Sequence, residues 1–183
     1  HAALIIVVEG NEDRISLDAL LSHHSSVLAE ALRTGALTFE TLGGASKLPY
    51  ALSLLRALVC NYFVVLDNDD EGQKAFREAQ TSLLLTHANV CFTNCLELKQ
   101  SELEDLFDAN LYVKYFTNEY GVDIKRSPFA EKRKWSERIR FGMTKSGKQW
   151  TEQLEYKDKH KIAEMVKANP AGAIHPSRME IFT

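Results

Sequence analysis

Short apolar runs recur along the first half of the chain and alternate with segments of helical spacing. The runs at 3–8 and 62–66 are continuously apolar, as is typical of strands buried on both faces of a parallel sheet. A weakly alternating segment at 37–42 and a shorter run at 89–93 predict two further strands. Because the segments between them have helical character, the predicted order is β-α-β-α-β-α-β. That order favours right-handed crossovers and an α/β fold, with a parallel sheet flanked by helices.

The pattern changes after about residue 96 and becomes mainly helical. Ser101 and Glu104 have the spacing of a helix capping box, while Gly142 and Gly147 are expected to interrupt helices. The helices predicted between the strands and in this second half cover 50–59, 73–80, 101–107, 110–120 and 156–168.

Acidic residues directly follow two of the predicted strands. Glu9 and Asp13 come after the first apolar run, and Asp67 and Asp69 come after the run at 62–66. Since the carboxyl ends of parallel strands share one edge of the sheet, these four carboxylates are expected to converge. Converging carboxylates repel each other unless a cation neutralises them, and their hard oxygen atoms suit Mg²⁺ or Mn²⁺. A pair of such ions can stabilise the attacking and the leaving oxygen of a phosphoryl transfer.

Each of these acids taken alone is most often a helix cap or a solvated loop residue. The neighbouring Glu12, Asp18, Asp70 and Glu71 are expected to be solvated. The combined pattern of E-G-x-x-D and D-x-D weakens that interpretation for the four strand-end acids. An EF-hand loop starting at Asp67 is another interpretation, but a strand precedes it where a helix is needed. A receiver or haloacid dehalogenase-like phosphotransfer domain would place Asp rather than Glu after the first strand.

Composition and charge limit the expected cellular compartment of the protein, but they do not identify a ligand. The net charge of −3 does not indicate nucleic acid binding, although the second half is locally basic. The three cysteines, Cys60, Cys91 and Cys95, suit a reducing cytosol and lack the paired spacing of structural zinc. No apolar run reaches membrane-spanning length. We therefore expect a cytoplasmic protein without a membrane partner.

The acidic motifs together resemble a known family. E-G-x-x-D at 9–13, L-D-x-D at 66–69 and the following Gly72 are similar to the signature of the Toprim domain. Topoisomerases, primases and a group of nucleases share that domain. A third acidic element, L-E at 103–104, makes the set resemble the nucleases of the overcoming lysogenization defect (OLD) family. The resemblance covers residues 4–110 and is thin beyond them.

The resemblance implies a role for each matching residue. Glu9 and Asp13 would take part in catalysis together with a late lysine, for which Lys159 is the first choice and Lys161 the second. A lysine there could stabilise negative charge that develops on the phosphate, although these lysines also suit a solvated helix face. The residues implied to hold two Mg²⁺ or Mn²⁺ ions are Glu9, Asp13, Asp67, Asp69, Glu102 and Glu104, with Asp105 as an alternative to Glu104.

The implied function is a metal-dependent DNA endonuclease that nicks or cleaves by two-metal phosphodiester hydrolysis, with a role in phage defence. A Toprim-like catalytic core at 1–110 would precede a helical, basic extension at 111–183 that completes the active site. The tyrosines lie in no recognisable topoisomerase motif, and the zinc-binding and polymerase parts of a primase are lacking. The alternative is a non-catalytic Toprim-like module that binds metal and nucleic acid in a regulatory role.

The resemblance also implies partners beyond this chain. OLD-family nucleases usually carry an ABC-type ATPase amino-terminal to this domain, and the sequence contains no G-x-x-x-x-G-K-[ST] motif. The chain begins with His and enters a strand at once. We therefore expect a longer natural protein with an N-terminal ATPase domain, which could form a homo-oligomer through the missing region.

DNA is the expected partner of the basic and aromatic region at 125–150. Its cations could follow the phosphates, and Trp135 or Trp150 could stack on bases. A solvated charged face and buried tryptophans are the simpler alternatives. The cations chosen for DNA contact are Lys132, Lys134 and Arg138.

Overall fold

The computed structural model describes residues 2–178 and places a parallel sheet in the first half of the chain. Its strands are β1 (Leu4–Val8), β2 (Leu37–Thr41), β3 (Tyr62–Leu66) and β4 (Val90–Phe92). They lie in the order β2-β1-β3-β4, and every neighbouring pair is parallel. The predicted α/β class, with a parallel sheet, is therefore confirmed.

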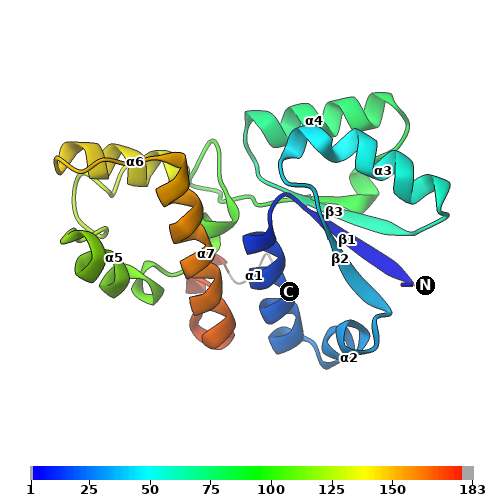
Figure 1. Cartoon of the computed structure of the whole chain (residues 1–183), viewed down its shortest axis with the longest axis horizontal. Helices are drawn as coiled ribbons and strands as arrows, with labels where there is room; N and C mark the ends of the chain where they lie inside the picture. Colours follow the sequence, from blue (N-terminus) through cyan, green and yellow to red (C-terminus); the bar gives the residue numbers. More distant parts are fainter. Residues whose placement is uncertain (1, 179–183) are drawn as a thin grey trace. The chain divides into compact units, whose positions relative to one another are not determined.

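Helices cover both faces of this sheet (Figure 1). The helices α1 and α2 lie on one face, and α3 and α4 lie on the other. These helices are α1 (Asn11–His24), α2 (Ser26–Thr34), α3 (Leu48–Ala57) and α4 (Asp70–Thr81), with short 3₁₀ turns η1 (Ala45–Lys47) and η2 (His87–Asn89).

The core of this unit lies between the sheet and the helices α3 and α4. Val7 of β1 and Val64 of β3 are fully buried, as are Leu48 and Leu52 of α3. Phe76 of α4 packs in the same cluster. Alternate residues of the continuously apolar strands can thus be buried on opposite faces. This packing fixes the two central strands that precede the acidic residues.

The register of the strands brings their carboxyl ends to one edge. Val7 pairs with Val64 between β1 and β3, and Val8 pairs with Thr41 between β1 and β2. The chain leaves β1 at Glu9 and β3 at Asp67, so these two acids follow neighbouring strands at the same edge of the sheet.

The second half of the chain forms a separate, mainly helical unit. The chain divides into two compact units between Thr93 and Asn94, earlier than the sequence-based division between 110 and 111. The segment after β4 belongs with the second unit because Phe107 bridges to Ile174 and the His175 N–H donates to the Leu106 carbonyl. Its elements are η3 (Leu103–Leu106), η4 (Ala109–Leu111), α5 (Val113–Tyr120), α6 (Trp135–Lys145), α7 (Glu152–Ala168) and η5 (Pro170–Gly172).

Three local predictions in the second unit are wrong. Gly142 does not end a helix but lies inside α6. It packs against the Phe129 ring, and a Cβ atom at this position would come 2.1 Å from that ring. The capping box at η3 is formed by Glu102 and Asp105, one residue later than predicted from Ser101 and Glu104. The helix predicted at 101–107 is a single 3₁₀ turn.

The core of the second unit is aromatic. Phe116 is fully buried and lies 6.4 Å, centroid to centroid, from both Trp135 and Trp150. Ile139 and Met143 of α6 and Ile162 of α7 are also buried in this core. Among the helices at positions 2–178, none combines the length and apolar character that a membrane crossing needs.

Candidate functional site

The acids at the ends of the two central strands meet at the sheet edge of the first unit. The Asp67 backbone N–H donates a hydrogen bond to Glu9 Oε1 over 2.9 Å. Both residues are partly exposed. This bond joins the first residues after β1 and β3, which are 58 positions apart in sequence. The Glu9 carboxylate thus lies beside the Asp67 backbone, and convergence of the two carboxylates on a metal ion stays a prediction.

Thr93 is a member of this edge that the sequence did not single out. Its side chain is almost fully buried at the end of β4. The Thr93 hydroxyl donates to Asp67 Oδ1 over 3.2 Å and accepts the Asn68 N–H over 3.3 Å. A threonine after a strand carries no distinctive sequence signal, and only the pairing of β3 with β4 brings it beside Asp67. We therefore regard Thr93 as a positioning residue for the Asp67 carboxylate.

The other two predicted ligands have local hydrogen bonds at helix N-termini. Asp13 Oδ2 accepts the Gly10 N–H over 2.7 Å in the capping arrangement of α1. Asp69 is the N-cap of α4, and its Oδ1 accepts the Gly72 N–H over 2.9 Å. Capping of this kind stabilises a helix by about 1 kcal/mol. Asp13 and Asp69 therefore have a structural role at this edge, and metal binding by either residue stays a prediction.

A close backbone approach explains the glycine of the second acidic motif. A Cβ atom on Gly72 would come 2.2 Å from the Asp67 carbonyl oxygen, so the turn between β3 and α4 requires glycine. A Cβ atom on Gly10 would come 2.4 Å from Glu12 Oε1, which is the end of a flexible side chain that can move aside. The D-x-x-x-x-G spacing thus allows the chain to turn tightly after Asp67.

Glu12 differs from the solvated residue that the sequence predicted. Its side chain folds back over Gly10 and is only partly exposed. Glu12 Oε2 is buried and has no hydrogen-bond partner within residues 2–178. A buried carboxylate oxygen without a partner is costly, and a bound cation would remove that cost. Glu12 is therefore a further acidic candidate at this edge.

The donor chemistry of the edge fits a hard divalent cation. Within the described part of the chain, no group of three or more His, Cys, Asp or Glu side chains is arranged as a ready-made metal site. Mg²⁺ is usually held by one or two carboxylates, with water and substrate phosphates as its remaining ligands. Glu9 and Asp67, with the unsatisfied oxygen of Glu12, match that mode of binding better than an all-protein cage.

A second group of acids lies buried within the second unit, around η3. Glu102 is 3% exposed, and its carboxylate contacts two ammonium groups. Lys134 Nζ lies 2.9 Å from Glu102 Oε1, and Lys159 Nζ lies 3.3 Å from Glu102 Oε2. The Ser136 N–H and hydroxyl also donate to this carboxylate. Burial alone would raise the pKa of Glu102, but the two lysines and the Ser136 hydrogen bond lower it to about 2.

Asp105 lies beside Glu102 and binds the backbone as well as a cation. Its Oδ2 accepts the N–H groups of Glu102 and Trp135, each over 2.9 Å. Its Oδ1 lies 3.2 Å from Arg138 Nη2. Burial nevertheless outweighs these contacts and raises the pKa of Asp105. Asp105 thus connects η3 to the first turn of α6.

Of the two candidate lysines, Lys159 faces the acids of its unit. Its Nζ lies 3.4 Å from Glu104 Oε2 as well as 3.3 Å from Glu102 Oε2. Lys161 is exposed. Because α7 begins at Glu152, Lys159 lies in the middle of a helix. The structure therefore brings together the late lysine and the third acidic element, while their catalytic role stays a prediction.

The cations chosen for DNA contact fall into two kinds. Lys134 and Arg138 form ion pairs with Glu102 and Asp105, and their side chains are only 19% and 20% exposed. Lys132 is exposed. Trp135 is fully buried, so the core alternative holds and stacking on a base is excluded for this residue.

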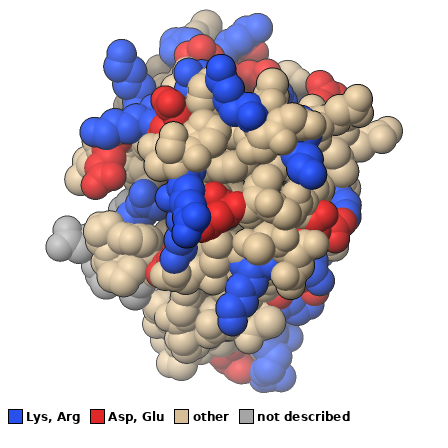
Figure 2. Space-filling view, turned by 90° about the vertical axis from the view of Figure 1, so that its left-hand side faces the viewer, with Lys and Arg blue, Asp and Glu red and all other residues tan. Residues whose placement is uncertain are grey.

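The basic region is also compensated by acids on the surface. Figure 2 faces the side on which α5 and α6 lie, and it shows red side chains interspersed among the blue ones. Exposed pairs include Arg140 with Glu155 at 3.1 Å and Lys157 with Glu119 at 2.5 Å. This face is therefore not a uniformly basic surface, and DNA contact by it stays a prediction.

A parallel sheet with acids after its two central strands defines the first unit as a TOPRIM-like α/β domain. Residues 1–69 match the family model described as overcoming lysogenization defect protein-like, TOPRIM domain. Residues 1–69 are therefore similar to an OLD-like TOPRIM domain, and this match supports a nuclease-type domain. The match includes Glu9 and Asp67 and ends at Asp69. A search of the curated proteins and one of the solved structures each return no match to this chain.

Proposed function

We propose that this chain is the nuclease part of an OLD-type endonuclease and hydrolyses DNA phosphodiester bonds with the help of Mg²⁺ or Mn²⁺. The observation that carries the proposal is the hydrogen bond between the Asp67 N–H and Glu9 Oε1. It holds the Glu9 carboxylate against the backbone of Asp67 at the edge of a parallel sheet, where α/β proteins bind ligands. The family match over residues 1–69 includes both residues.

Glu9 and Asp67 would hold the divalent cation. When bound, such an ion stabilises negative charge on a phosphate and lowers the pKa of a bound water molecule. The Thr93 hydroxyl keeps one oxygen of Asp67 in a fixed direction. Glu12 would supply a further oxygen from the first turn of α1, because its Oε2 has no partner among the described residues.

The second unit would contribute the basic and acidic residues predicted to complete the reaction. Two ions, with Glu102 and Glu104 as ligands of one of them, belong to this proposal. Lys159 would stabilise charge on the phosphate, with Lys161 as the alternative. Support comes from the contacts of Lys159 Nζ with Glu102 and Glu104, which fix the ammonium group in a single place.

The proposed substrate, partner domain, location, biological role and oligomeric state follow only from the family. The proposal includes DNA as the substrate and an ABC-type ATPase domain amino-terminal to this region. It also includes a cytoplasmic location, a role in phage defence and assembly of the longer protein into a homo-oligomer. These expectations are extended from the family that residues 1–69 resemble.

Supercoiled plasmid is the direct test of the nuclease proposal. The chain, incubated with Mg²⁺ or Mn²⁺, should convert plasmid to nicked or linear forms. Asp67→Asn should lower that rate by more than about 100-fold, beyond the 10–100-fold typical of a residue that only supports a ligand. Asp70→Asn is the matched control, because Asp70 is an exposed acid in the first turn of α4. It should cut like the parent.

Two outcomes would overturn the nuclease proposal. One is an intact plasmid with either metal, and the other is full activity of Asp67→Asn. The second candidate function is a non-catalytic module that binds metal and nucleic acid. It is supported by the same sheet edge, because Glu9 and Asp67 would hold a cation whether or not a phosphodiester bond is cut. Metal-dependent binding of a labelled DNA without cleavage, followed by fluorescence anisotropy, would support it.

A further inference from the structure

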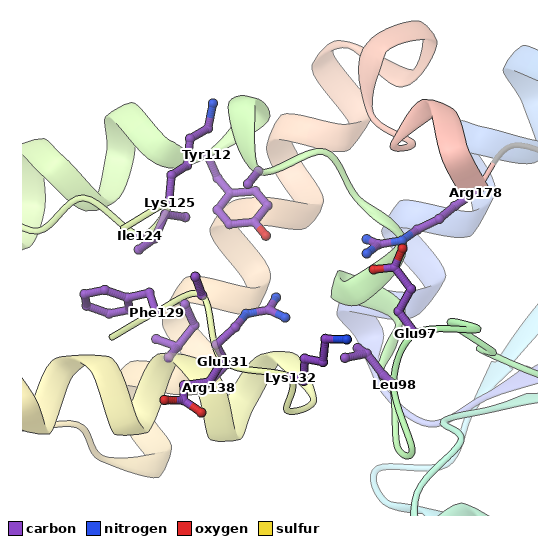
Figure 3. Close-up of a pocket in the computed structure, with 13 residues that line it drawn as sticks. Glu97, Leu98, Tyr112, Ile124, Lys125, Phe129, Glu131, Lys132, Arg138 and Arg178 are labelled. Atoms are coloured by element: carbon purple, nitrogen blue, oxygen red, sulfur yellow. The ribbon is translucent and has the colours of Figure 1, made fainter. Parts of the chain in front are cut away.

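The second unit contains a cavity of about 360 Å³ that none of the predicted catalytic acids lines (Figure 3). It lies between the start of the basic region, the middle of α6 and the last described turn of the chain. Its size is at the small end of the range for ligand pockets. A single nucleotide fits a cavity of this size, whereas a duplex does not.

Three cations reach this cavity from different segments of the chain. Figure 3 shows the guanidinium group of Arg138 pointing into it, with Lys132 and Arg178 on the side toward Leu98. Lys132 forms no ion pair or hydrogen bond with any of residues 2–178. An exposed ammonium group without a partner, beside two guanidinium groups, is suited to a phosphate.

The arginines are held in place by their own contacts. Arg138 Nη2 pairs with Asp105 Oδ1 at 3.2 Å, and its Nη1 donates to the Arg133 carbonyl over 3.3 Å. Arg178 Nη1 donates to the Asp105 carbonyl. A guanidinium group has five N–H donors, so these bonds leave others for a ligand. The two arginines are therefore positioned before any ligand arrives.

Two acids also line the cavity and limit its positive charge. Glu131 lies 4.0 Å from Arg133 Nε through its Oε2, and in Figure 3 the Glu97 carboxylate points toward Arg178. Four cations, counting Lys125, face two acids in the lining. Lys125, however, points away from the cavity in Figure 3 and donates to the Asn110 side chain. The positive charge is thus concentrated on Lys132, Arg138 and Arg178.

The remaining wall is apolar. Phe129 and Ile139 are buried, 3% and 2% exposed, and Ile124 lies next to them in the lining. Burial of apolar ligand surface against such a wall is favourable. A phosphate alone would leave this wall exposed, while an apolar ligand would leave the cations without a partner. A ligand that has both a phosphate and a flat, weakly polar ring system matches both parts.

We propose that this cavity binds one nucleotide, with the phosphate at Lys132, Arg138 and Arg178 and the base against Phe129 and Ile139. The nucleotide could be free or could be the terminal residue of a DNA strand. The site contains none of the residues proposed to hold metal, so binding requires no divalent ion. The inference therefore goes beyond the proposed hydrolysis and can fail or succeed independently of it.

Isothermal titration calorimetry of the full 183-residue chain in EDTA tests this proposal. Deoxyadenosine 5′-monophosphate should bind, and both deoxyadenosine and inorganic phosphate should bind at least about tenfold more weakly, because each lacks one of the two recognised parts. Short single strands that end in 5′-phosphate, 3′-phosphate or hydroxyl then distinguish the source. Tighter binding of a phosphorylated strand than of the mononucleotide would identify a strand end, and the reverse would identify a free nucleotide.

Two variants and one control locate the site. Lys132→Glu should weaken binding of the mononucleotide by more than about tenfold, because it replaces an attractive charge by a repulsive one. Ala130→Trp, at an exposed position of the lining, should fill the cavity and abolish binding. Lys148→Glu makes the same charge change at an exposed site outside the cavity and should leave binding unchanged.

Three results would overturn the proposal. They are no binding of the mononucleotide by the parent chain, unchanged binding by Lys132→Glu, and an equal loss in Lys148→Glu. Circular dichroism of each variant confirms that it is folded. Since metal is absent and cleavage is not measured, these results do not depend on whether the chain is a nuclease.

Discussion

Carboxylates gather in both compact units, but they differ in burial. In the first unit, Glu9 and Asp67 are partly exposed, and their contacts include a backbone N–H to Glu9 and a threonine hydroxyl to Asp67. In the second unit, Glu102 and Asp105 are buried and contact the side chains of lysine and arginine. Neutral donors orient a carboxylate and preserve its charge, whereas ammonium and guanidinium groups also compensate that charge.

This difference assigns different tasks to similar residues. An acid that retains its charge at a sheet edge can attract a metal ion, so its loss should affect function more than folding. A buried acid that compensates two lysines should affect folding strongly, because its removal takes a carboxylate away from two largely buried ammonium groups. The two tryptophans, Trp135 and Trp150, both lie in the second unit, so tryptophan fluorescence follows the unfolding of that unit.

Replacement of one glutamate in each unit should give the largest contrast in stability. Glu102→Gln removes the carboxylate that Lys134 and Lys159 share, while Lys159 keeps its contact with Glu104. It should lower the free energy of unfolding of the second unit by about 3–4 kcal/mol, toward the low end for breaking a buried ion pair. Glu9→Gln keeps a side-chain oxygen that can accept the Asp67 N–H. It should change the same free energy by less than about 0.5 kcal/mol.

Urea unfolding followed by tryptophan fluorescence measures both variants. Glu137→Gln serves as a control for the second unit, because Glu137 is an exposed glutamate in the first turn of α6. Equal stability of Glu102→Gln and the Glu137→Gln control would show that the buried ion pairs contribute nothing net. The contrast between the two units would then be lost.

The contribution of Glu102 should also appear in the pH dependence of the free energy of unfolding, with a slightly smaller effect. The pKa of Glu102 is lowered from 4.5 to about 2 in the folded protein. Its contribution of about 3 kcal/mol is therefore present above pH 4.5 and is lost as the pH falls through about 2. The stability difference between the parent chain and Glu102→Gln should accordingly shrink between pH 5 and pH 2.

Asp158 should show a pH dependence of stability opposite to that of Glu102, because its pKa is raised rather than lowered. Burial raises its pKa, although the hydroxyls of Tyr115 and Tyr120 donate to its Oδ1 over 2.6 and 3.0 Å. Its contribution is present below its ordinary value of 3.8 and is lost as the pH rises through the raised pKa. Relative to the parent, Asp158→Asn should gain stability from pH 4 to pH 7. Parallel pH profiles for Glu102→Gln and Asp158→Asn would contradict both assignments.

The sheet and its acidic edge were predictable because their signals are local in sequence. The strands expected at 3–8 and 62–66 are observed at Leu4–Val8 and Tyr62–Leu66, since a continuous apolar run has few alternatives to a buried strand. Parallel pairing then brings Glu9 and Asp67 to one edge without further information. The close approach of the Asp67 carbonyl explains why the residue at position 72, shortly after the D-x-D motif, is a glycine.

The second unit was less predictable because its key contacts join segments far apart in sequence. Lys134 approaches Glu102 from the N-cap of α6, and Lys159 approaches it from α7. The sequence pattern around a lysine on an amphipathic segment is the same whether its side chain is solvated or paired with an acid. Gly142 was expected to break a helix because glycine has low helix propensity. The need to admit the Phe129 ring, 13 positions earlier, outweighs that preference.

Thr93 offers the smallest and most specific test of the contrast between the units. Thr93→Val removes the hydroxyl that donates to Asp67 Oδ1 and accepts the Asn68 N–H, while it preserves the shape of the side chain. If neutral donors orient Asp67 for a cation, Mn²⁺ affinity measured by calorimetry should fall by about tenfold, at the low end for a residue that supports a metal ligand. Thr93→Ser keeps the hydroxyl and should restore most of that affinity. An equal loss of affinity in both variants would instead indicate that Thr93 matters only for packing at the end of β4.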